Sequence, residues 1–396
     1  MKLHAFRLFL SSATVALFTS TPSLEARPHY GLGEFIFLTA GLNLPDWSMN
    51  NSSVLSYGSM VNMPALSSIG EIGALLGQLD QPYHANTTTF AREVDAFFSE
   101  HTGSRDGHHP VNRDAWETFA SGQWQSSSPD SGNSRPIFDS RSWGGLIGIK
   151  RWVDDERFIG LTASYASTQT TIHNDGGQTD GENFRLRLYT ALVPEGQPWW
   201  LVFGVSGGYV SYDTLRNMPL GNSTFPDEVT AKTNGYEIGL FAAFFTRLHI
   251  SESLAFTPFA RIDYDNVSIN KLTEEGSDYN YALNRFNAYS CQTRIGAGLE
   301  YASEFSFGFI KANCTVAWAS ELANDNIKLT ARFASLSGYT RHHVYANQLF
   351  HDAVEFTPSF SLVLKDSLVL QLSYQLQLTF DAQLSQTGTA SIGWRF

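Results

Sequence analysis

The sequence predicts an all-β protein, a 12-stranded antiparallel transmembrane β-barrel with an N-terminal α-helix threading its lumen. Three observations predict this fold. Apolar and polar residues alternate over long segments, short and long connections between those segments take turns along the chain, and the last alternating segment runs to the final residue. Because successive side chains of a strand point to opposite faces, one face would contact lipid and the other would line the lumen.

Composition excludes several classes of function. The 396 residues carry a formal net charge of −12, and only 16% are charged whereas 14% are aromatic. This acidic balance leaves no basic stripe to neutralise phosphates, so we expect no nucleic acid as a partner. Two cysteines do not make a disulfide framework in a chain of this length. We expect no cofactor, no bound metal, no small-molecule substrate and no enzymatic activity.

The chain divides into four expected regions. The first resembles an export signal, because Lys2 and Arg7 precede an apolar run and Ala26 supplies a small residue for cleavage. The second and third show helical spacing of apolar residues, and the fourth shows strand spacing. These regions are the signal peptide 1–26, a short passenger-like helical segment 27–86, a pore helix with its linker 87–114, and the barrel 115–396.

Twelve segments read as strands. The clearest is 367–380, in which leucine and aromatic residues alternate with glutamine, serine and threonine. It is longer than the ~5–6 residues usual in sheets and exceeds the ~9–11 residues that a tilted strand needs to cross a bilayer. The expected strands are 115–126, 141–152, 157–169, 181–193, 198–213, 231–247, 253–269, 284–300, 305–318, 352–364, 367–380 and 387–396.

Connection lengths give the orientation. The links after the second, fourth, sixth, eighth and tenth strands are short, and those after the first, third, fifth, seventh and ninth are longer and rich in Gly, Asn, Asp and Ser. Outer-membrane barrels have short periplasmic turns and long outer loops. The pattern therefore predicts the outer membrane of a Gram-negative-type bacterium, with the long loops at the cell surface. The longest loop, 319–351, holds a strand-like piece at 327–336.

The terminal strand must pair with the first, because each unpaired backbone group in lipid costs several kcal/mol.

The two faces of the strands differ in chemistry. Aromatic residues near the short turns are typical of an interfacial girdle: Trp152, Trp199, Trp200, Phe245, Tyr301, Phe305, Trp394 and Phe396. The charges on the opposite face are expected to line the lumen: Lys150, Arg185, Arg187, Glu237, Arg261, Asp263, Asp265, Arg294 and Glu355.

The helix expected at 86–101 carries its apolar residues on one stripe and is a candidate to fill the lumen. A barrel of twelve strands is intermediate between eight-stranded barrels, which their own side chains fill, and water-filled porins. Alternatively, the lumenal charges simply solvate a channel wall.

The two cysteines lie on neighbouring expected strands. A turn near 302–303 would place Cys291 directly opposite Cys314 on the lipid-facing side. Directly opposed residues have Cβ atoms ~4.5–5.5 Å apart, and an exported compartment permits oxidation. The sequence leaves open whether the two thiols are joined or free.

The segments "AWETFASGQW", "SWGGLIGIKRW", "FIGLTASYAST", "DGENFRLRLYTALV" and "LAFTPFARIDYDN", in this order, resemble the translocator domain of the autotransporters, the type V secretion proteins. The resemblance covers about 115–396, and the helix before it resembles the family's linker. It implies a barrel that conveys or displays its own N-terminal segment and needs periplasmic chaperones and the outer-membrane assembly machinery. The last strand would be the assembly signal, with Ile392, Trp394 and Phe396.

One feature departs from that family, and two alternatives remain. Only about 60 residues, 27–86, separate the signal from the pore helix, where the family usually carries hundreds. A surface-exposed structural or adhesive barrel without a secretion role is the first alternative. A barrel hydrolase is the second, because His249 and Ser251 have a suitable spacing, although both fall in a short turn with nothing to orient the base.

Overall fold

A computed structural model gives the fold of the barrel region. Among the residues it describes, no helix is both long and apolar enough to cross a membrane. The expected N-terminal helix, the expected signal and Phe396 lie outside the described residues, which are 116–129, 138–154, 156–172, 177–194, 196–218, 227–276, 280–306, 308–322, 326–334, 342–347, 352–364, 368–379 and 383–395.

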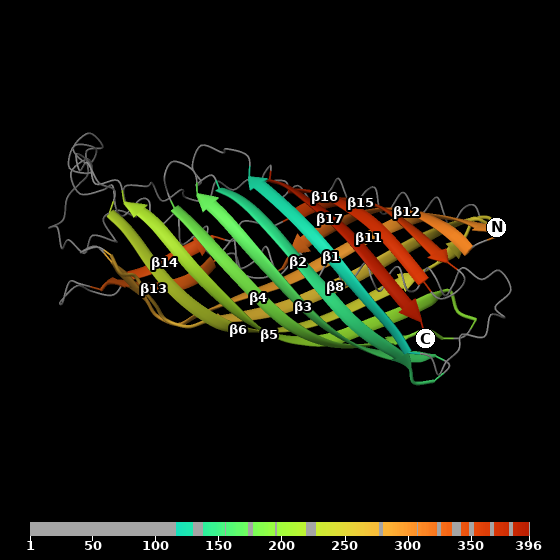
Figure 1. The fold of residues 1–396 in the computed structure, drawn as a ribbon, viewed down its shortest axis with the longest axis horizontal. Coiled ribbons are helices and arrows are strands. Elements are labelled where there is room, and N and C mark those ends of the chain that lie inside the picture. The colour runs from blue at the N-terminus through green and yellow to red at the C-terminus, as the bar shows by residue number, and fades with distance from the viewer. Residues whose placement is uncertain are drawn as a thin grey trace. The chain divides into compact units, whose positions relative to one another are not determined.

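Twelve long antiparallel strands form one closed sheet, as the sequence predicts. Figure 1 shows the last strand lying beside the first, and the two pair from Glu117 opposite Arg395 to Pro129 opposite Gln383. In the order of the sheet the strands are β1 (Trp116–Pro129), β2 (Phe138–Trp152), β3 (Arg157–Ile172), β4 (Gly177–Leu192), β5 (Trp199–Met218), β6 (Asp227–Thr246), β8 (Leu254–Ile269), β11 (Phe286–Phe305), β12 (Gly308–Glu321), β15 (Asp352–Leu364), β16 (Leu368–Thr379) and β17 (Gln383–Arg395).

Two long connections contribute a second, four-stranded sheet. Its order is β14 (His342–Asn347), β13 (Asn326–Phe333), β10 (Tyr281–Leu283) and β9 (Leu272–Thr273). The strand-like piece expected at 327–336 is therefore confirmed as β13. Backbone hydrogen bonds between Thr230 and Glu275 link this sheet to β6. The two-residue strand β7 (Leu248–His249) pairs with the start of β8 at the opposite rim.

Side chains alternate between a buried inner face and an exposed outer face. On β4 the alternation is unbroken from Thr179 to Tyr189. The outer face is strongly apolar, since Ile147, Ile238 and Ile295 are each more than 60% exposed. An apolar surface of this extent suits contact with lipid, where every backbone group must be satisfied within the closed sheet.

Two expectations about particular residues are wrong. Trp200 and Phe245 are buried and face the interior, and Trp152 packs on the same interior cluster, so these three residues do not belong to an outer girdle. The turn between β11 and β12 falls four residues later than expected, because the alternation runs on to Phe305 and the break comes at Gly308. Gly308 has φ 148°, and a Cβ there would lie 1.9 Å from the Val363 carbonyl oxygen, so this position requires glycine.

The later turn separates the two cysteines. Cys314 is opposite Leu299, Cys291 is opposite Tyr264, and both are free thiols. The predicted Cys291–Cys314 pairing is therefore wrong, because the register that would oppose them needs the earlier turn.

We expect Leu299→Cys to form a disulfide with Cys314 under mild oxidation, because the two positions are direct partners. The wild-type chain should keep two blockable thiols, measured by mass analysis after thiol alkylation. Leu299→Cys combined with Cys314→Ser is the control and should stay unlinked. A Cys291–Cys314 bridge in the wild-type chain would contradict the register.

Candidate functional site: the inner wall of the barrel

The inner wall has two chemically different parts. Ion-bearing side chains line β4, β6, β8, β11 and β15, and hydroxyls and amides line the wall from β16 through β17, β1 and β2 to β3. Glu117 and Lys150, 3.0 Å apart near the short-turn rim, are the charged pair that interrupts the neutral part of the described wall. The buried neutral residues are Gln371, Gln375, Thr379, Ser385, Thr387, Thr389, Ser121, Gln123, Gln125, Ser127, Ser140, Ser142, Thr162, Ser164, Thr168 and Thr170.

The first ion pair joins β4 to β6 across the strand between them. Arg185 Nε and Nη2 donate to the two carboxylate oxygens of Glu237 at 2.5 and 2.7 Å, and Asn183 Nδ2 donates at 2.9 Å. Gly208 on β5 lies opposite both Arg185 and Glu237. A Cβ on Gly208 would lie 2.3 Å from Glu237 Oε1, so the missing side chain is what lets the pair cross β5.

A longer chain of ions runs from β8 to β15. Arg261 donates to both oxygens of Asp263 at 2.7 Å, and Arg294 Nη1 lies 3.1 Å from Asp263 Oδ2. Arg294 Nε also donates to Glu355 Oε1 at 3.2 Å, across β12. The partner of Arg294 on β12 is Ala319, which is fully buried. A small residue again stands where an ion pair passes over a strand.

Together these buried ion pairs form what we call the ion belt, and neighbouring groups extend it. Arg187 and Arg261 lie 5.6 and 5.5 Å from the centre of the Phe241 ring, within cation–π range. Asp265 packs over Gly239, where a Cβ would lie 2.0 Å from its Oδ1. Burying ions costs several kcal/mol each unless partners compensate, so these pairs hold the strands in one arrangement.

An apolar cluster covers the inner wall toward the short-turn rim. Trp200 stacks on Phe245 with ring centres 5.4 Å apart, and Phe158 meets Tyr189 edge to face at 6.0 Å. Two glycines make room for the rings, because a Cβ on Gly160 would enter the Tyr189 ring and one on Gly204 would lie 2.6 Å from Phe241. The buried members are Phe158, Tyr189, Ala191, Trp200, Val202, Phe241, Ala243 and Phe245.

Most of the residues that the sequence singled out lie in the part of the chain that the structure describes. Eight of the nine expected lumenal charges are buried on the inner face, and the Lys150 side chain is 11% exposed. Ile392 and Trp394 are exposed on the outer face of β17. His249 ends β7 and Ser251 lies in the turn before β8; both are exposed, and no carboxylate among the described residues hydrogen-bonds the His249 ring.

Sequence reasoning missed some members of the wall. Glu300 on β11 binds Arg247 and lies 3.8 Å from Lys311 Nζ, close to the short turns. Arg216 and Glu274 form a 2.5 Å pair toward the long loops. Glu300 and Lys311 already lie within the expected strands 284–300 and 305–318, and Glu300 is in phase with Arg294, so the alternation itself was the signal that could have found Glu300.

The inner wall presents a polar surface made of ion pairs, hydroxyls and amides. Ion pairs join Arg185 to Glu237 and Arg294 to Glu355 within the wall. The described residues contain no group of three or more His, Cys, Asp or Glu that could hold a metal ion. Such a wall suits the passage or docking of a hydrophilic polypeptide.

Comparisons with known proteins agree with this architecture. A family model described as "Autotransporter beta-domain" matches residues 118–375, which is more than half of the chain. The translocator domain of autotransporter NalP from Neisseria meningitidis is 15% identical, with a TM-score of 0.56 over 79% of this chain and 99% of that domain. The β-domain of the Bordetella autotransporter Brka is also 15% identical, with a TM-score of 0.50 over 72% of this chain and all of that domain.

Two curated relatives are longer proteins. Both are named Esterase EstA, from Pseudomonas aeruginosa and Pseudomonas putida, and are 25% identical over 234 residues. The match covers 56% of this chain but only 34% of each esterase. Because β1 begins at Trp116, much of the match must fall within the barrel.

We expect Gly208→Ala to destabilise the folded barrel by about 3–5 kcal/mol, the range for breaking a buried ion pair. The new methyl group would displace Glu237 from Arg185. The measurement is urea unfolding in lipid vesicles, followed by heat-modifiable gel mobility. Gly207→Ala is the matched control, because that Cβ faces outward with its nearest neighbour at 3.9 Å. Equal stability of the two variants would show that the pair does not depend on the gap at Gly208.

Proposed function

The chain belongs to the autotransporter β-domain family and forms an outer-membrane translocator barrel, and from this premise we propose that it conveys or displays its own N-terminal segment at the cell surface. The segment in question is 27–86, with 87–114 as the pore helix and linker. Export would begin with the signal at 1–26.

One observation carries the proposal: the sheet closes between β1 and β17 around a polar inner wall. A closed sheet leaves no unpaired edge in lipid, and its interior offers hydrogen-bonding groups to a hydrophilic chain. The neutral wall of hydroxyls and amides supports this use, because it can exchange hydrogen bonds with passing backbone groups without holding a charge.

The pore helix fits the other part of the wall. Its expected apolar stripe of Phe90, Val94, Phe97 and Phe98 matches the apolar cluster near the short turns, and its charged residues match the ion belt. We propose that the helix stands against β3 to β8, where both kinds of surface occur. The N-terminal part of the chain would then leave through the long-loop end.

Before it folds, the chain exposes groups that the folded barrel hides, so its assembly requires partner proteins. We propose periplasmic chaperones for the exported, unfolded chain and the outer-membrane assembly machinery for insertion. The last strand is the proposed recognition element, and the exposed outward positions of Ile392 and Trp394 support this. Phe396 completes the proposed signal. Outer-membrane lipids contact the apolar outer face.

A second candidate is a surface-exposed structural or adhesive barrel without a secretion role. The four-stranded sheet built from β9, β10, β13 and β14 favours it, because ordered strands in long loops can present a fixed binding surface. We propose no catalysis by the barrel. The esterase activity in the names of the two relatives belongs to those longer proteins.

We predict that a protease-cleavable tag inserted near residue 30 will be cut on intact cells, because display places that segment outside. A tag in the β4–β5 turn at Gly196 should be cut only after the outer membrane is permeabilised, and one between β13 and β14 should be cut at once. A shielded residue-30 tag on a barrel that keeps heat-modifiable mobility would support the adhesive barrel instead.

A further inference from the structure

The outer face of the barrel carries a polar area among its otherwise apolar side chains. Near the long-loop ends of β1 to β6, two outward rows cross the strands in register. The first row joins Trp124, Trp143, Ser167, Glu182 and Ser211. The second, two residues nearer the loops, joins Ser126, Arg141, Gln169, Asp180, Asp213 and Lys232.

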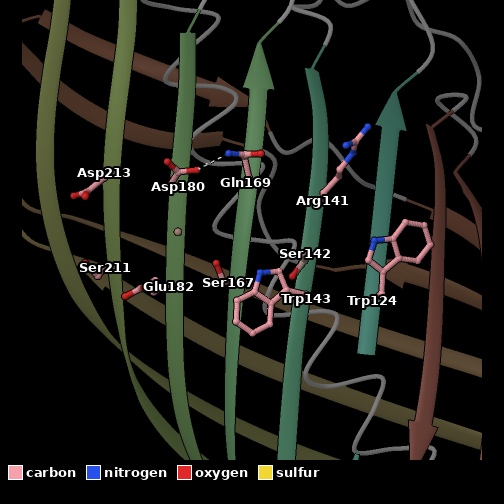
Figure 2. Close-up of a pocket in the computed structure, with 11 residues that line it drawn as sticks. Trp124, Arg141, Ser142, Trp143, Ser167, Gln169, Asp180, Glu182, Ser211 and Asp213 are labelled. Carbon is pink, nitrogen blue, oxygen red and sulfur yellow. Dashed lines mark hydrogen bonds between the residues drawn. The ribbon is translucent and has the colours of Figure 1, made fainter. Parts of the chain in front are cut away.

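These rows enclose a pocket of about 500 Å³, within the ~300–1,000 Å³ usual for ligand sites. Figure 2 shows its arrangement, with Trp124 and Trp143 on neighbouring strands, Glu182 between Ser167 and Ser211, and Gln169 turned toward Asp180. Because Ser167 and Ser211 have short side chains, open space remains on either side of Glu182. Trp124 and Trp143 are 49% and 60% exposed, and Trp143 also contacts the Tyr165 ring, with ring centres 5.7 Å apart, so both indoles keep exposed surface for a ligand.

The polar groups keep spare hydrogen-bonding capacity. Asp180 accepts from Gln169 Nε2 at 3.2 Å and, at both oxygens, from Gln178 Nε2 at 3.0 Å. Glu182 accepts from Tyr165 Oη at 3.1 Å, and Asp213 pairs with Lys232 at 2.8 Å. A carboxylate offers about four acceptor positions, so each can accept further bonds from hydroxyl groups. Aromatic faces beside carboxylates, amides and a guanidinium match a sugar, which has C–H faces and a rim of hydroxyls.

Other ligand chemistries fit less well. Three carboxylates in one pocket repel a bare phosphate, and Arg141 is the one cation among the lining residues. The carboxylates are spread along two rows, and the described residues contain no cluster that could hold a metal ion. A headgroup that is rich in hydroxyls and carries no net charge is the best match.

The surface below the pocket fits acyl chains. The next row toward the short turns begins with Gly122 and Gly145 and continues with the aromatic residues Tyr165 and Phe184. A Cβ on Gly122 would meet nothing within 4 Å, so the surface at this position is open; we call Gly122 and Gly145 the glycine floor. Beyond it lies an apolar groove of about 510 Å³ whose lining includes Ala120, Ile147, Leu161, Ile392 and Trp394.

We propose that this face binds a membrane glycolipid, with its sugar headgroup in the Trp124–Trp143 pocket and its acyl chains along the glycine floor and the apolar groove. The pocket lies at the long-loop end, so the lipid belongs to the leaflet that faces the cell exterior. The two tryptophans would stack on the sugar, and Glu182 and Asp180 would accept its hydroxyl hydrogen bonds.

The test uses the full chain, folded in tetraoxyethylene octyl ether micelles, which carry no sugar. Native mass spectrometry compares retained digalactosyl diacylglycerol with phosphatidylglycerol of the same acyl chains. We expect glycolipid retention about fivefold or more above that of phosphatidylglycerol, which corresponds to about 1 kcal/mol. We expect a loss of similar size in Trp143→Ala and in the isosteric Glu182→Gln.

Trp318→Ala is the matched control, because Trp318 is another outward tryptophan near the long-loop end, on β12. It should leave glycolipid retention unchanged, and heat-modifiable mobility should confirm that every variant folds. Equal retention of both lipids, or equal loss in Trp318→Ala, would overturn the proposal. Calcium-dependent retention of phosphatidylglycerol alone would also overturn it in favour of a bridging cation. If free digalactose displaced the retained glycolipid as strongly as the intact lipid does, the proposed binding of the acyl chains would be refuted.

Discussion

Closure of the backbone hydrogen-bond ladder is the constraint on which the rest of the structure depends. Within lipid no water can satisfy an open strand edge, so the sheet is stable only when its last strand meets its first. The continuous pairing of β1 with β17 over 13 residue pairs meets that requirement. Strand length, strand number and the two rims of short and long connections all follow from a sheet that must close across a membrane.

Closure also creates an interior that must be filled or solvated. Long charged side chains fill part of this interior as ion pairs. Small residues on the intervening strands let these side chains reach a partner two strands away. Gly208 lies beneath the Arg185–Glu237 pair, and Ala319 occupies the strand that Arg294 crosses to reach Glu355. Each pair spans three strands, so the ion belt resists shear between neighbours as well as neutralising buried charge. The neutral wall presents mainly hydroxyls and amides, and we propose it as the surface along which the chain moves.

The sequence predicts the strands well because a membrane-crossing strand must alternate for longer than any soluble strand needs to. It predicts the lumenal charges for the same reason. It fails where both faces are apolar, as at Trp199 and Trp200, because alternation cannot then say which ring points inward. The glycine that accommodates an inward ring lies on a neighbouring strand, as Gly160 does for Tyr189, and only the register reveals that relation. The misplaced β11–β12 turn has a similar cause, since alternation continues past the expected turn to Phe305. Sequence reasoning could not find the proposed glycolipid pocket, because its two rows of outward side chains come together only when six strands pair in register.

Cross-linking at the seam tests the closed sheet most directly. In a chain with Cys291 and Cys314 replaced by serine, Ala120→Cys and Ile392→Cys lie directly opposite each other on β1 and β17. Closure predicts that mild oxidation in lipid joins them while the protein keeps its heat-modifiable mobility, and that Ala120→Cys with Leu370→Cys, one strand further away, stays unlinked. A folded, membrane-inserted chain in which the Ala120–Ile392 pair cannot be joined would contradict the account.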